Sequence, residues 1–103
     1  MTNLNNERAA AICESVSALI RGDRNKAHGD IVKQHQNAAI LATAYLKAKY
    51  GFPYNLTSED MCLLMVQLKI SRSISGTYNI DDYQDGAGYF GGAGACRAVE
   101  EGL

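Results

Sequence analysis

The stretch Met61–Ile70, with the sequence MCLLMVQLKI, is apolar on almost every side when it is drawn as a helix. Thr57 or Ser58 precedes it as an N-cap, and Glu59 and Asp60 follow in the first turn, where the helix macrodipole favours negative charge. A helix without a polar face belongs inside a packed protein. We therefore expect an all-α protein in which this helix, the third of four, is the central and most buried element.

Two amphipathic helices are predicted before this segment. The first covers about residues 6–21, is capped by Asn5 or Asn6 and stops at Gly22. The second covers about residues 30–50 and ends at Gly51 and Pro53. The period-two alternation typical of β-strands is absent. The predicted architecture is a compact bundle of about four helices.

The fourth predicted helix, about residues 81–100, is rich in glycine. Each interior glycine costs ~1 kcal/mol relative to alanine, so five of them cost roughly 5 kcal/mol, comparable with the stability of a domain. Such a helix is stable only where another helix packs closely on it, and the alternative is a break near Gly91 and Gly92. We expect it at a subunit interface, which predicts a homo-oligomer. The five glycines are Gly86, Gly88, Gly91, Gly92 and Gly94.

The composition is that of one globular domain over residues 1–103, with 47% hydrophobic and 20% charged residues. A net charge of −1 gives no basic field, which argues against non-specific nucleic-acid binding. No apolar run is long enough to span a membrane, and Met1–Arg8 is too polar for a signal peptide. The three cysteines show no metal-ligand spacing. We expect a cytoplasmic protein with reduced thiols.

Residues 86–91, GAGYFG, match the G-x-G-x-x-G pattern of dinucleotide-binding folds. That fold requires a β-strand before the glycines, so that the pyrophosphate meets the start of the next helix. Here the preceding residues 81–85 are DDYQD, which begin a helix. The pattern is therefore not interpreted as a dinucleotide site.

Four ionic residues flank the predicted loop between the third and fourth helices. Asp81 and Asp85 are four residues apart, so a helix places both carboxylates on one face, where they invite Mg²⁺, Mn²⁺ or a basic side chain. Lys69 and Arg72 would bind phosphate oxygens or pair with these aspartates. The alternative for both pairs is compensation of the helix macrodipoles. A short loop should bring all four residues together.

A second basic segment precedes the helix predicted to start at Asp30. Arg21, Arg24, Lys26 and His28 lie there, and free amides at a helix N-terminus beside cations form an anion site. The alternative is a solvated polar loop. His35 interrupts the apolar stripe of the same helix, and we interpret it as a hydrogen-bonded core or interface residue.

Three of these segments carry a family resemblance. They are His28–Asp30 (HGD), Met65–Arg72 (MVQLKISR) and Asp81–Tyr89 (DDYQDGAGY), with Gly76 between the last two. The chain resembles a family of small phage and prophage proteins of uncharacterised function. It is more distantly similar to the nucleotide-modification-associated phage domain and, through it, to all-α MazG-type nucleotide pyrophosphohydrolases, which use Mg²⁺ held by helix carboxylates.

The chain departs from the MazG pattern in its acidic residues. MazG-type sites have two acidic pairs, typically Glu-xx-Glu and then Glu-xx-Asp. This chain offers Asp81 and Asp85, with only Asp30 or Glu59 as isolated extras. Two-metal phosphate chemistry needs more carboxylates. The resemblance therefore implies a phage origin and a nucleotide-related site, and we expect little or no catalysis.

Three functions fit these observations. The first is binding of a nucleotide or other phosphorylated small molecule, either in phage nucleotide metabolism or to sequester a defence signal. The second is a divergent Mg²⁺-dependent nucleotide pyrophosphohydrolase, and the third is a protein-binding anti-defence inhibitor without a small-molecule site. The candidate ligand-binding residues are His28, Lys69, Arg72, Tyr83 and Tyr89. The candidate metal ligands are Asp81, Asp85 and Asp30.

Overall fold

The computed structural model describes residues 3–22, 26 and 29–103. These residues form four helices and no strand, which confirms the predicted all-α bundle. The helices are α1 (Leu4–Arg21), α3 (Ile31–Tyr50), α4 (Ser58–Ser75) and α5 (Ile80–Glu100).

Local side-chain chemistry fixes where each helix begins. Asn3 caps α1, and the Asp30 carboxylate accepts hydrogen bonds from the backbone N–H groups of Val32 (2.8 Å) and Lys33 (3.2 Å) at the start of α3. Thr57 and Asp60 form a reciprocal capping box that starts α4. These caps satisfy backbone N–H donors that would otherwise lack partners, and so determine where each helix begins. The observed helix starts lie within a few residues of the predicted ones.

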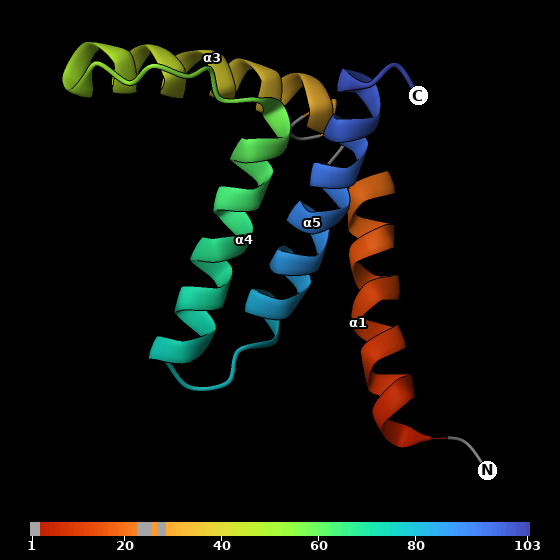
Figure 1. Cartoon of the computed structure of the whole chain (residues 1–103). Coiled ribbons are helices and arrows are strands. Elements are labelled where there is room, and N and C mark those ends of the chain that lie inside the picture. Colours follow the sequence, from red (N-terminus) through yellow and green to blue (C-terminus); the bar gives the residue numbers. More distant parts are fainter. Residues whose placement is uncertain (1–2, 23–25, 27–28) are drawn as a thin grey trace.

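The helices α4, α5 and α1 lie side by side, and α3 crosses one end of this layer (Figure 1). Among the described helices, α5 contacts each of the other three, α4 contacts α3 and α5, and α1 contacts only α5. The glycine-rich helix therefore holds the central place that the sequence suggested for α4. The physical reason is that small residues let several neighbours approach one helix, whereas α4 leaves Leu64 and Leu68 each 47% exposed.

The core is thin and is built from small side chains. Cys62 and Cys96 are fully buried, Ala93 is nearly so, and Val32 and Leu63 pack against them. No leucine, isoleucine, methionine, phenylalanine or tyrosine among the described residues is buried. In the part of the chain that the structure describes, no helix is both long and apolar enough to cross a membrane.

The glycines of α5 divide into two groups. A Cβ added at Gly92 would lie 2.8 Å from Ile31 Cδ1 and 3.4 Å from Cys62 Sγ, so α3 and α4 approach α5 closely there. Gly88 is also buried. A Cβ at Gly91 or Gly94 would meet no described atom within 4 Å. The helix is continuous from Ile80 to Glu100 and does not break at Gly91 and Gly92.

Candidate functional site

Two basic residues of α4 face two aspartates of α5. Lys69 Nζ lies 3.1 Å from Asp85 Oδ2, and Arg72 Nε lies 3.8 Å from Asp82 Oδ1. The Lys69 and Asp82 side chains are only 11% and 8% exposed, whereas Arg72 is 58% exposed. We name these four residues the α4–α5 ionic cluster. Their grouping agrees with the prediction that the two helices meet at this end.

The short turn between the helices explains this position. The helix α4 ends at Ser75, and the Asn79 side chain caps α5 by accepting a hydrogen bond from the Asp81 N–H at 3.0 Å. The last turns of α4 therefore lie beside the first turns of α5. A Cβ at Gly86 would lie 3.7 Å from Lys69 Cβ, an ordinary van der Waals contact, so α4 and α5 pack directly against each other here.

The aspartate pair differs from the one that the sequence suggested. Asp81 is exposed in the first turn of α5, whereas Asp82 is buried and faces Arg72. Asp82 and Asp85 are three residues apart, which matches the spacing of Lys69 and Arg72 on the facing helix. That matched spacing is the sequence signal that would have identified Asp82.

The candidate metal ligands do not form a common group. Asp30 caps α3, and its carboxylate accepts backbone hydrogen bonds. Among the described residues, no three His, Cys, Asp or Glu side chains lie together so that they could hold a metal ion. His28 and Arg24 lie outside the described residues, so the anion site suggested at the start of α3 stays a prediction.

The two candidate tyrosines lie on different sides of α5. The rings of Tyr89 and His35 meet edge-on, with centroids 6.0 Å apart. Tyr83 instead stacks on Tyr78 with centroids 5.6 Å apart and is 46% exposed. Each residue of an α-helix advances the side-chain direction by about 100°, so two side chains six residues apart differ by about 240° around the helix axis. Only Tyr89, four residues after Asp85, therefore shares a face with that carboxylate.

His35 itself has a structural role in the described chain. It is 7% exposed, and its Nδ1 lies 2.7 Å from the Ile31 carbonyl oxygen. Because a carbonyl oxygen only accepts, Nδ1 carries the proton and donates. The interpretation of His35 as a hydrogen-bonded core residue agrees with this geometry.

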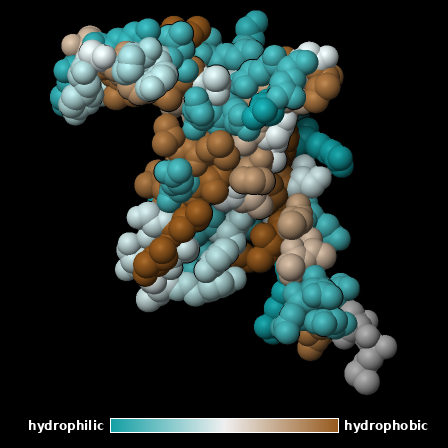
Figure 2. Space-filling view, in the orientation of Figure 1, coloured by the Kyte–Doolittle hydropathy of each residue, from teal (hydrophilic) through white to brown (hydrophobic). Residues whose placement is uncertain are grey.

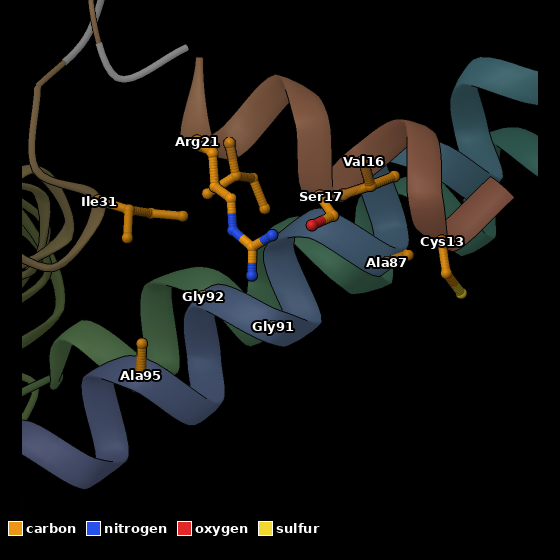
Figure 3. Close-up of a pocket in the computed structure, with 10 residues that line it drawn as sticks. Cys13, Val16, Ser17, Arg21, Ile31, Ala87, Gly91, Gly92 and Ala95 are labelled. Carbon is orange, nitrogen blue, oxygen red and sulfur yellow. The ribbon is translucent and has the colours of Figure 1, made fainter. Parts of the chain in front are cut away.

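Two cavities accompany the central helix. One of about 220 Å³ lies between α4 and α5, and Lys69, Asp82 and Tyr83 are among its lining residues. The other, of about 390 Å³, lies between α1, α5 and the start of α3 and is mostly apolar (Figure 3). Arg21 is its one charged lining residue among those described. Lys69 and Asp82 of the ionic cluster therefore border the first cavity.

These features define a small all-α protein with a paired ionic cluster between two antiparallel helices. Residues 11–97 match the family described as "Domain of unknown function (DUF6378)", and the chain belongs to this family. The match confirms the resemblance to a family of small phage proteins, since the relatives below are encoded by phages.

The chain is similar to two mycobacteriophage proteins. It is 35% identical to the "Gene 55 protein" of Mycobacterium phage L5 over 81 residues, which cover 79% of this chain and 49% of the phage protein. It is 32% identical to the "Gene 55 protein" of Mycobacterium phage D29 over 81 residues, which cover 79% and 50%. The chain thus spans about half the length of these curated relatives. No solved structure matches it.

Proposed function

We propose that the protein binds a nucleotide or another phosphorylated small molecule at the α4–α5 ionic cluster, in the cytoplasm of a phage-infected host cell. The observation that carries this proposal is the burial of Lys69 and Asp82 between two helices. A buried ion pair stabilises a fold only a little, because the attraction between its groups must offset the hydration that both groups lose. Polar side chains that converge on a cleft are candidates for ligand binding.

Arg72 is the residue best placed to meet a phosphate. Its guanidinium has only a long contact with Asp82, at 3.8 Å, and 58% of the side chain is exposed. Most of its N–H donors therefore face solvent, and a guanidinium binds phosphate oxygens in bidentate fashion. Lys69, held by Asp85, adds a fixed positive charge beside it. Tyr89 would offer an aromatic face to a base, and Tyr83 lines the adjoining cavity.

The cluster supports binding better than hydrolysis. A divergent MazG-like pyrophosphohydrolase would use Asp82 and Asp85 as one acidic pair for Mg²⁺. However, basic residues occupy the facing positions on α4, where a second acidic pair would complete a two-metal site. The third function, inhibition of a host defence protein through the surface, draws support from the many exposed apolar side chains. We also expect a homo-oligomer, as the glycine-rich helix predicts.

Thermal-shift measurements with nucleoside triphosphates, deoxynucleotides and cyclic nucleotides, with and without Mg²⁺, test the proposal. A bound ligand raises the melting temperature of the native state by mass action. Arg72→Ala should abolish the shift. Arg97→Ala is the matched control, because Arg97 is 57% exposed and is paired with Glu59 and Glu101 at the other end of α5.

The possible results separate the three functions. A shift without Mg²⁺ and without pyrophosphate release supports a binding protein. Mg²⁺-dependent pyrophosphate release at about 1 s⁻¹ or faster, ordinary for an enzyme, that disappears in Asp85→Ala would establish the hydrolase instead. The absence of any shift across the panel would overturn nucleotide binding and leave the protein-binding inhibitor.

A further inference from the structure

The described helices form one layer rather than two. The helices α4, α5 and α1 lie side by side, and α3 crosses only one end of them (Figure 1). A stable domain buries the apolar face of one layer against a second layer. Over most of the length of α5, no described helix supplies that second layer on the side of Phe90, which is 63% exposed.

The accessible surface area of the chain also indicates that a second layer is missing. Its accessible surface is 7356 Å², whereas a folded monomer of 11.1 kDa exposes about 5,700 Å². Its radius of gyration is 15.7 Å, and a compact chain of this length has about 13 Å. The excess of about 1,700 Å² is surface that a self-contained domain of this mass would bury.

The uncovered face has a defined composition. Along α5, Tyr83, Ala87, Phe90 and Gly94 recur at the i, i+4, i+7 and i+11 positions of one helical stripe. Across the groove, α4 presents Ile70 and Ile74, which are 54% and 79% exposed. We name these six residues the Phe90 face. Figure 2 shows hydrophobic residues gathered over α4 and α5.

Two grooves run on either side of the α5 stripe. The cavity of about 220 Å³ separates α5 from α4, and the cavity of about 390 Å³ separates α5 from α1. Ala87 lines both cavities, which places them on either side of the same ridge. Grooves of this kind accept the side-chain ridges of packed helices. The open space at Gly91 and Gly94 permits such a helix to approach closely.

We infer that a second copy of this chain covers the Phe90 face, so that two helical layers pack against each other about a two-fold axis. The inference rests on the oligomer of the proposed function and specifies its interface. Two copies that each bury the excess area would hide about 3,400 Å² in total, within the range of obligate homodimers. Such interfaces resemble a domain core cut in half.

Charge also favours a second copy. All six residues of the Phe90 face are uncharged, so two identical faces meet without repulsion. Among the described residues, the charged groups lining the two grooves are Lys69, Asp82 and Arg21, and the first two already lie in ion pairs. In a two-fold interface each residue occurs twice, so one new charge on this face becomes a pair of like charges.

The test compares two lysine substitutions on α5. Phe90→Lys adds a charge to the Phe90 face, and Val99→Lys adds the same charge nine residues later, on the opposite side of the helix. Val99 is 52% exposed, so the control matches in exposure as well. Light scattering after gel filtration should give twice the 11.1 kDa chain mass for the wild type and for Val99→Lys. Phe90→Lys should reduce it to one chain.

Ile70→Lys, on the α4 side of the same face, should act like Phe90→Lys. If either variant does not fold, the melting temperature of the wild-type protein still decides, because that of a dimer rises with protein concentration and that of a monomer does not. A wild-type mass of one chain with a constant melting temperature would overturn the inference. A dimer that survives both Phe90→Lys and Ile70→Lys would also overturn it. Nucleotide binding is measured separately, so the two proposals fail independently.

Discussion

The ammonium group of Lys69 lies 3.1 Å from the carboxylate of Asp85, and only 11% of the lysine side chain is exposed. The pair joins α4 to α5 close to the turn between them. A lysine has a long flexible side chain and a strongly hydrated head group, so burying it carries entropic and desolvation costs. An apolar pair in the same place would have stabilised the hairpin at least as well.

A double-mutant cycle at this pair should separate stability from function. We expect Lys69→Met to lower the free energy of unfolding by about 1–3 kcal/mol, because it leaves the partly buried Asp85 without its facing cation. Lys69→Met combined with Asp85→Leu should recover most of that loss. Urea denaturation of the four proteins measures the cycle.

The exposed pair of Arg97 and Glu101 provides the comparison. Both side chains are about half exposed and solvent screens their attraction, so Arg97→Ala should destabilise the protein much less than Lys69→Met. If the double variant at Lys69 and Asp85 stays as unstable as Lys69→Met, the pair is needed for the fold itself. That result would remove the main reason for assigning it to ligand binding.

A graded series at Gly92 tests the close approach of the helices. Gly92→Ala should change stability by less than about 1 kcal/mol, because its methyl group displaces only the flexible end of Ile31 and alanine favours the helix. Gly92→Leu should cost about 1–3 kcal/mol or more, since it must also displace the buried Cys62. Equal melting temperatures for the two variants would show that this contact is not tight.

Asp30 offers a direct choice between a cap and a metal ligand. Asparagine caps helices as well as aspartate does, so Asp30→Asn should leave stability nearly unchanged, whereas Asp30→Ala should lower it by about 1 kcal/mol. A metal ligand would behave differently, because asparagine lacks the charge that Mg²⁺ prefers. Loss of a Mg²⁺-dependent thermal shift in Asp30→Asn would instead identify Asp30 as a metal ligand.

The helices could be predicted because their signals are local. The capping residues Thr57 and Asp60, the stop at Gly51 and the apolar spacing in α1 each act within a few residues. The identity of the central helix could not be predicted in this way. Hydrophobicity pointed to α4, but the small residues of α5 admit three neighbours, and that property depends on helix–helix distance.

The candidate site was predicted in outline and not in detail. The chain order of Lys69, Arg72 and Asp85 required only that a short turn fold two helices together. The choice between Asp81 and Asp82 depended on where α5 begins: with Asn79 as its cap, Asp81 turns to solvent and Asp82 turns to α4. A shift of one residue rotates a side chain by about 100°, so uncertainty in a helix boundary becomes uncertainty about the residues of a site.

The buried thiols of Cys62 and Cys96 should make stability fall at high pH. Their sulfur atoms lie 4.0 Å apart, and burial, with Cys96 adding to it, raises the pKa of the Cys62 thiol from its ordinary value of 9.0 to about 12. The folded protein holds this proton more tightly than the unfolded chain does. The protonated Cys62 thiol therefore makes its full contribution to the stability of the fold below pH 9. It is lost as the pH rises from about 9 to 12, by up to about 1.4 kcal/mol per pH unit.

Comparison with Cys62→Ala isolates this effect from the other groups that titrate at high pH. The variant is expected to be less stable at neutral pH, since it removes a fully buried side chain, but its stability should fall less steeply between pH 9 and 12. Denaturant unfolding across this range measures both slopes. At pH 8 a thiol reagent should react promptly with the exposed Cys13 and reach Cys62 and Cys96 only on unfolding. Parallel slopes for the two proteins, or three prompt thiols in the native protein, would show that the pair is open to solvent.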